Sequence, residues 1–144
     1  MVEEIKKKNR TLAIIVRDKY QCEGIDFITP SEYSQQMAYM HHPKGKIIDA
    51  HVHNVVHRDV LMTQEVVLIK KGRLCVDFYD DYEDYLESVI LYQGDTILLV
   101  SGGHGFKALE ELEMIEIKQG PYAGENDKVR FGGVSDDDVV IKGE

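Results

Sequence analysis

Short apolar runs separated by turn residues make up most of the chain. Runs of about four to eight residues rich in β-branched or aromatic side chains, bounded by glycine, proline or aspartate, are typical of strands. This criterion predicts strands at residues 12–16, 24–30, 46–56, 65–70, 73–79, 86–91, 96–100 and 113–118, with residues 35–39 as a further candidate. Only residues 106–112 hint at a helix, and residues 1–10 suggest a helical turn or a loose arm.

Residues 46–56 alternate most regularly between apolar and polar side chains. The apolar positions share one face and the polar positions the other: Ile48, Ala50 and Val52 against Asp49, His51 and His53. Side chains on a strand point to opposite faces with a period of two. The pattern therefore predicts a strand that presents two imidazoles side by side, which suits a metal ion or paired acid–base chemistry.

The number of short strands and the glycine-containing turns between them favour an all-β fold, an antiparallel β-sandwich or small barrel. Lys71-Gly72 lies between two predicted strands and is typical of a hairpin turn. The apolar run 12–16 precedes the other strands and would leave an exposed edge in a monomer, so we expect a homodimer in which this strand meets the partner.

The chain length of 144 residues fits one domain with a real core. We expect a single domain over residues 1–144, with its core at about residues 11–131. The tail 132–144 contains three consecutive aspartates, Asp136 to Asp138, before the apolar residues 139–141. We expect partial disorder of this tail, with a terminal strand as the alternative.

Composition narrows the classes of partner. Hydrophobic residues make up 43% of the chain and charged residues 30%, which is typical of a soluble globular protein. The net charge of -9 argues against nucleic acid or an anionic membrane as a partner. The first residues lack the apolar core of a signal peptide, so we expect cytoplasmic localisation. Cys22 and Cys75 match no zinc-binding spacing.

The segment around the paired histidines resembles the first motif of the cupin superfamily. Gly45 is followed by five residues and then by His51-Val-His53, and Glu65 precedes Gly72 by six intervening residues. The sequence departs from the motif in the spacer 54–64, which is several residues longer than the usual three or four, so the loop must bulge.

A second segment resembles the second cupin motif. Gly94 opens the strand that ends at Val100, and His104 follows in Ser101-Gly-Gly-His104. Here the family's Pro-x-Gly turn is replaced and shortened by one residue, and Ala108 stands where the family often has asparagine. The resemblance covers about residues 45–118. It implies a cupin jelly roll, an antiparallel β-barrel, with a metal held by His51, His53, Glu65 and His104.

Those four side chains suit a divalent metal on chemical grounds as well. Neutral imidazoles and a carboxylate bind iron, manganese, nickel, zinc or copper, and the sequence leaves the identity of the metal open. Three or four such ligands leave positions on the metal for a substrate. His57 in the spacer could replace Glu65 as a ligand or act as acid–base, with exposure to water as the alternative.

Other residues are candidates for moving protons. Glu116 and Lys118 share a strand face and are expected to point into the barrel beside His104, with an exposed ion pair as the alternative. Together with His57 they are the candidate catalytic residues. Asp49 could orient an imidazole of the paired histidines.

The chain also resembles a set of small bacterial cupins that carry Gly-Gly-His-Gly-Phe and Lys-Gln-Gly-Pro-Tyr and accompany surface-sugar biosynthesis. This resemblance implies a small polar metabolite, such as a sugar or sugar nucleotide, as the substrate of a metal-dependent isomerase or epimerase. A metal-dependent dioxygenase and a ligand-binding or regulatory cupin without turnover stay open. Proton transfer by histidines without a metal, as in ketoisomerases of similar fold, is a further alternative.

Overall fold

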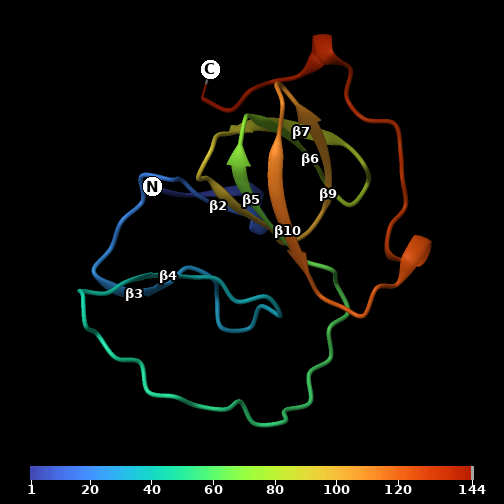
Figure 1. Ribbon diagram of the computed structural model, residues 1–144. Helices are drawn as coiled ribbons and strands as arrows, with labels where there is room; N and C mark the ends of the chain where they lie inside the picture. Colours follow the sequence, from blue (N-terminus) through green and yellow to red (C-terminus); the bar gives the residue numbers. More distant parts are fainter. Residues whose placement is uncertain (144) are drawn as a thin grey trace. The chain divides into compact units, whose positions relative to one another are not determined.

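The computed structural model describes residues 1–143, which form two compact units (Figure 1). Unit 1 consists of residues 1–20 and the chain from residue 63 onward, and unit 2 consists of residues 21–62. The single domain over residues 1–144 stays a prediction. Among residues 1–143 there is no helix with the length and apolar character needed to cross a membrane.

Unit 1 contains two antiparallel sheets and unit 2 a two-stranded one. The five-stranded sheet of unit 1 has the order β1-β2-β8-β5-β10 and the three-stranded sheet the order β7-β6-β9. The strands of unit 1 are β1 (Val2–Lys7), β2 (Arg10–Val16), β5 (Glu65–Lys71), β6 (Leu74–Tyr79), β7 (Tyr85–Leu91), β8 (Thr96–Leu99), β9 (Gly103–Ala108) and β10 (Glu113–Lys118). Short 3-10 helices follow at Gly124–Asp127 and Asp136–Asp138. Unit 2 pairs β3 (Gly24–Phe27) with β4 (Ala38–His41).

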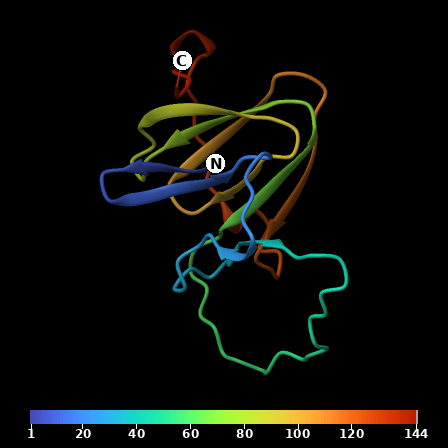
Figure 2. The same ribbon diagram turned by 90° about the vertical axis from the view of Figure 1, so that its left-hand side faces the viewer.

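The hydrophobic core of unit 1 lies between its two sheets (Figure 2). Alternate residues of each strand face the core, as the period of two requires. Both sheets contribute to the buried cluster, which comprises Ile5, Leu12, Ala13, Ile15, Val67, Ile69, Leu74, Val76, Phe78, Val89, Leu91, Ile97 and Leu99. The prediction of an all-β, antiparallel fold is therefore confirmed. The two sheets keep separate edge strands, so they do not form a closed barrel.

The predicted hairpin at Lys71-Gly72 is wrong. The strands on either side, β5 and β6, belong to different sheets, and the chain crosses from one sheet to the other at Gly72, where φ is +84°. Val67 and Val76 then enter one core from opposite sides, and both are fully buried. Burial between two sheets outweighs the local turn signal, because it removes apolar area from water on both strands.

The first residues form a strand rather than a loose arm or helical turn. β1 and β2 make a hairpin, seen in blue in Figure 2, whose turn includes Lys8 at a φ of 55°. β2 lies between β1 and β8, so the exposed edge that motivated a homodimer is covered within the chain. That argument for dimerisation is wrong. The homodimer itself stays a prediction, which light scattering can test.

Two other sequence predictions also fail. Residues 103–108 form β9, so no helix starts at Phe106; instead His104 and Phe106 pair across the sheet with Phe78 and Val76. Residues 46–56 form no strand, and among the described residues none lies between His41 and Glu65. A segment with a period of two forms a strand only where a neighbouring strand supplies backbone hydrogen bonds. In unit 2 the paired strands are β3 and β4, and neither pairs with residues 46–56.

The tail, for which we expected partial disorder, lies on the outer side of the three-stranded sheet. The hydroxyl of Tyr79 accepts a hydrogen bond from the Val134 amide at 2.9 Å, and the hydroxyl of Tyr85 accepts one from the Val140 amide at 2.9 Å. The Ser88 amide donates to the Val140 carbonyl at 2.8 Å. Beneath the tail, burial raises the pKa of the Cys75 thiol, which favours the protonated thiol over the thiolate.

Candidate functional site

Four ionisable side chains meet at one end of the sandwich in unit 1. Glu65 opens β5, His104 lies on β9, and Glu116 and Lys118 lie on β10. The register places them on the core-facing side of their strands: His104 lies opposite the buried Phe78, and Lys118 lies opposite Glu65. β9 and β10 are the edge strands of their sheets, so polar side chains on their inner faces keep contact with water.

Glu65 is the centre of this cluster. Its Oε2 lies 3.1 Å from Nε2 of His104, and its Oε1 lies 3.6 Å from Nζ of Lys118. The Lys118 ammonium also lies 3.2 Å from Oε1 of Glu116. The side chain of Glu65 is 11% exposed, whereas those of His104 and Lys118 are 32% and 25% exposed. The carboxylate is therefore the innermost group and the imidazole and ammonium are open to a ligand.

These contacts keep Glu65 ionised. The hydrogen bond with His104 lowers the pKa of the Glu65 carboxyl to about 2, with further help from the charges of His104 and Lys118, although burial acts in the opposite direction. The hydrogen bond to Glu116 raises the pKa of the Lys118 ammonium, and the charge of Glu65 adds to this effect. Around neutral pH the cluster thus holds a carboxylate next to a protonated lysine.

Replacement of Glu65 by glutamine should lower the free energy of unfolding at neutral pH by about 2 kcal/mol, the scale of hydrogen bonds to charged groups. The folded-state pKa of about 2 lies below the ordinary value of 4.5. The stabilisation by the carboxylate is therefore complete above pH 4.5 and is lost as the pH falls toward 2. Urea unfolding of wild type and Glu65→Gln at several pH values should show the difference narrowing over that interval.

The matched control for this prediction is Glu113→Gln. Glu113 is an exposed carboxylate on β10, outside the cluster. Its replacement should change the free energy of unfolding by less than about 0.5 kcal/mol at any of these pH values. A difference between wild type and Glu65→Gln that stays constant from neutral pH down to pH 3 would contradict the assigned contacts.

The imidazole of His104 has one nitrogen committed and one available. Nε2 faces the carboxylate of Glu65, and within residues 1–143 the structure gives Nδ1 no hydrogen-bond partner. A carboxylate that accepts the Nε2 proton fixes the tautomer and leaves a lone pair on Nδ1. This arrangement of imidazole and carboxylate can take a proton from a bound molecule, and the neighbouring ammonium of Lys118 can stabilise a developing negative charge.

The paired histidines of the sequence lie in unit 2. Their rings are close together, with centroids 5.3 Å apart and planes at 79°, and both side chains belong to exposed residues outside any strand. Nδ1 of His51 lies 2.8 Å from the backbone carbonyl oxygen of Asp49, so the contact uses the main chain rather than the expected carboxylate. His57 lies 3.0 Å from Oδ1 of Asp59, and its side chain is 86% exposed.

The predicted metal ligands therefore divide between the units, with Glu65 and His104 in unit 1 and His51 and His53 in unit 2. Within either unit, residues 1–143 contain no group of three or more His, Cys, Asp or Glu side chains arranged to hold a metal ion. The pair in unit 1 nevertheless suits a metal: two ligand atoms at about 2.1 Å and at right angles around one ion lie about 3 Å apart, close to the 3.1 Å between Glu65 and His104.

Sequence reasoning did not identify the place of Phe106 in the site. Phe106 lies beside His104, with ring centroids 5.2 Å apart. Gln119, which the sequence suggests could close the mouth of the pocket or bind an anionic group, accepts a hydrogen bond from the Gln64 amide at 2.8 Å and so ties the end of β10 to the start of β5. The two-residue spacing of His104 and Phe106 could have placed both on one face, had residues 103–108 been predicted as a strand.

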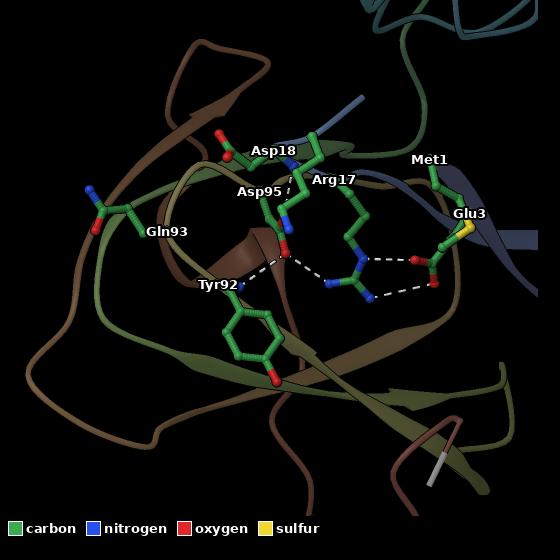
Figure 3. A pocket seen from close by; sticks show the side chains of 8 residues that line it. Met1, Glu3, Arg17, Asp18, Tyr92, Gln93 and Asp95 are labelled. Carbon is green, nitrogen blue, oxygen red and sulfur yellow. Dashed lines mark hydrogen bonds and ion pairs between the residues drawn. The ribbon is translucent and has the colours of Figure 1, made fainter. Parts of the chain in front are cut away.

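A separate hollow of about 520 Å³ lies near the amino terminus (Figure 3). It is lined by Met1, Glu3, Arg17, Asp18, Lys19, Tyr92, Gln93 and Asp95. Arg17 donates to Glu3 at 2.7 Å and to Asp95 at 2.8 Å, and Asp95 also accepts from the Asp18 and Tyr92 amides. These contacts join Arg17, Glu3 and Asp95 to one another and fasten strand ends together.

A comparison of the chain with protein families, with curated proteins and with solved structures finds no match. The functional argument therefore rests on the chemistry of the cluster formed by Glu65, His104, Glu116 and Lys118. Its composition of one imidazole, two carboxylates and one ammonium is suited to moving protons on a small molecule.

Proposed function

We propose that unit 1 carries a proton-transfer site for a small polar metabolite that contains a carbonyl group, such as a keto-sugar, and that the reaction is an isomerisation or epimerisation. The observation that carries this proposal is the 3.1 Å contact between His104 Nε2 and Glu65 Oε2, which leaves Nδ1 of His104 available. The ammonium of Lys118 beside the same carboxylate supplies the positive charge that the reaction requires.

In the proposed reaction Nδ1 of His104 takes a proton from the carbon next to the substrate carbonyl. The electron pair of the broken C–H bond moves into the carbonyl, whose oxygen becomes negative and accepts a hydrogen bond from Lys118. Delivery of a solvent proton to the opposite face of the same carbon, with release of the abstracted proton from His104 to water, gives an epimer. Return of the abstracted proton to the neighbouring carbon, with transfer of the hydroxyl proton to the oxygen, gives an isomer. Glu65 stabilises the imidazolium that forms when His104 takes the proton, and Glu116 holds Lys118 in place.

The cupin jelly roll is part of this proposal. Two antiparallel sheets around one core, with the order of both sequence motifs, support it. The departures in the spacer 54–64 and in the turn before His104 stand against a close match to the family pattern.

A second candidate function is a divalent metal site. The separation of Glu65 and His104 favours it, because the same distance suits two adjacent ligands of one ion. His51 and His53, the other two ligands that the sequence predicts, stay a prediction. A bound metal would polarise a substrate carbonyl or hydroxyl. Glu65 and His104 would then hold the ion, and Lys118 would keep its role toward the substrate oxygen.

Solvent exchange can test the proposal. The full chain is incubated in D2O with a panel of keto-sugars and small keto acids, before and after treatment with a chelator, and deuterium uptake next to the carbonyl is measured by NMR. The proposal expects uptake into at least one compound that survives chelation. Uptake that disappears with the metal and returns on its addition would favour the metal site, and uptake into no compound would refute catalysis on this panel.

Metal binding has its own expected outcome. If the metal site exists, elemental analysis of wild type should give about one divalent ion per chain, and His104→Ala with Glu65→Ala should lose it, since two ligands are removed. The double replacement His51→Ala with His53→Ala tests the other two predicted ligands. Loss of metal in this variant would support all four residues as ligands. Full metal content in both double variants would exclude all four residues as ligands.

A further inference from the structure

We infer that Phe106 is a specificity-determining residue that stacks against the ring of a pyranose sugar held beside His104. This inference rests on the proposed function and names its substrate class. The rings of Phe106 and His104 have centroids 5.2 Å apart and are tilted by 34°. The two residues are separated by one position on β9, so both side chains lie on the core-facing side of the strand.

Phe106 is exposed at a position where the fold otherwise buries apolar side chains. It lies opposite Val76, which is fully buried, yet Phe106 itself is 39% exposed. The cause is its place on an edge strand of the three-stranded sheet. Met114 shows the same behaviour on β10: it lies opposite the buried Ile69 and is also 39% exposed. Aromatic and thioether surface therefore remains uncovered beside the polar cluster.

The neighbouring charges favour an uncharged, hydroxyl-rich ligand. The ammonium of Lys118 offsets only one of the two carboxylates, Glu65 and Glu116, so with a neutral imidazole the cluster keeps a small negative charge. The carboxylate of Glu116 is 42% exposed and can accept hydrogen bonds from hydroxyl groups. An anionic ligand would meet two carboxylates here, and an apolar ligand would displace water from the exposed Glu116 carboxylate without offering a hydrogen bond in its place.

A pyranose ring combines both requirements. One face of the ring presents C–H bonds, which pack on the negative face of an aromatic ring, and its rim carries hydroxyl groups. A pyranose stacked on Phe106 would satisfy the carboxylates of the cluster from its rim and bring a ring carbon toward His104. An acyclic polyol has the hydroxyl groups but no rigid apolar face, so it gains less from the aromatic ring and loses more conformational entropy.

Binding measurements with defined probes test this inference. Methyl pyranosides of gluco, galacto, manno and fuco configuration are titrated into the full chain by calorimetry, with acyclic alditols of the same carbon number as the comparison. We expect at least one pyranoside to bind and the alditols to bind more weakly. Phe106→Leu should weaken pyranoside binding by about fivefold or more, because it removes the aromatic face but keeps apolar volume, and Phe106→Tyr should retain it.

Ile115→Ala is the matched control, because Ile115 is an exposed apolar residue on the opposite face of β10, and binding should change by less than about twofold. Equal affinity in wild type and Phe106→Leu, equal binding of alditols, or no binding of any pyranoside would overturn the inference. The proposed function fails separately, if deuterium uptake persists in His104→Asn. Uptake into acyclic keto acids without pyranoside binding would overturn the inference and leave the proposed function standing.

Discussion

Replacement of Phe78 by alanine is expected to lower the free energy of unfolding by about 4 kcal/mol. Phe78 is the largest of the fully buried side chains and is 1% exposed. It lies on β6, the central strand of the three-stranded sheet, and faces the core between both sheets. Truncation removes apolar contacts and leaves a cavity that the paired sheets cannot close completely. Urea unfolding followed by circular dichroism measures the effect.

The control for this prediction is Tyr82→Ala, which removes an aromatic side chain that is 86% exposed, and it should cost less than about 0.5 kcal/mol. Phe78 also lies directly opposite His104, so its loss should loosen the position of the imidazole. A cost below about 1 kcal/mol for Phe78→Ala would mean that the two sheets do not enclose one core as described.

The sequence predicted the features of unit 1 that depend on neighbouring residues. The sequence predicts β10 with its observed bounds, and the period of two in a strand places Glu116 and Lys118 on one face. The strands at β2, β7 and β8 were found from their β-branched runs. These features are local, because side-chain alternation is a property of a single strand.

The predictions that failed concern features that depend on which strands pair. β1 is rich in lysine and glutamate, and its only fully buried residue is Ile5, so its strand character comes from pairing with β2. Residues 46–56 show the opposite case, in which a strong alternation meets no partner strand and remains irregular. Pairing over long sequence separations is set by the whole core, which a window of a few residues does not contain.

The sequence predicts some residues of the site but not their contacts, because these contacts also depend on which strands pair. Glu65 and His104 are 39 positions apart in the sequence, and the structure brings them into contact through two strands in different sheets. Phe106 was not predicted, because residues 106–112 suggested a helix and the glycines at 103 and 105 obscured the strand. These glycines lie opposite Tyr79 and Asp77, whose side chains approach them closely, so small residues fit there for packing reasons.

Replacement of His104 by asparagine is expected to lower the rate of deuterium exchange into the substrate by about 10² to 10⁴-fold, the range typical of a lost general base. Asparagine keeps a polar side chain of similar reach but cannot accept and return the proton. Glu65→Gln should lower the rate by about a hundredfold, because an amide no longer holds the tautomer that exposes the Nδ1 lone pair. His41→Asn, on an exposed histidine of unit 2, serves as the control and should stay within about twofold of wild type.

NMR rates for these three variants and for the combined His104→Asn and Glu65→Gln variant, with circular dichroism to verify folding, make the comparison. A folded His104→Asn variant within tenfold of wild type would remove the imidazole from the mechanism. Losses that are equal in His104→Asn and Glu65→Gln, and no larger when the two are combined, would show that the two side chains act as one unit.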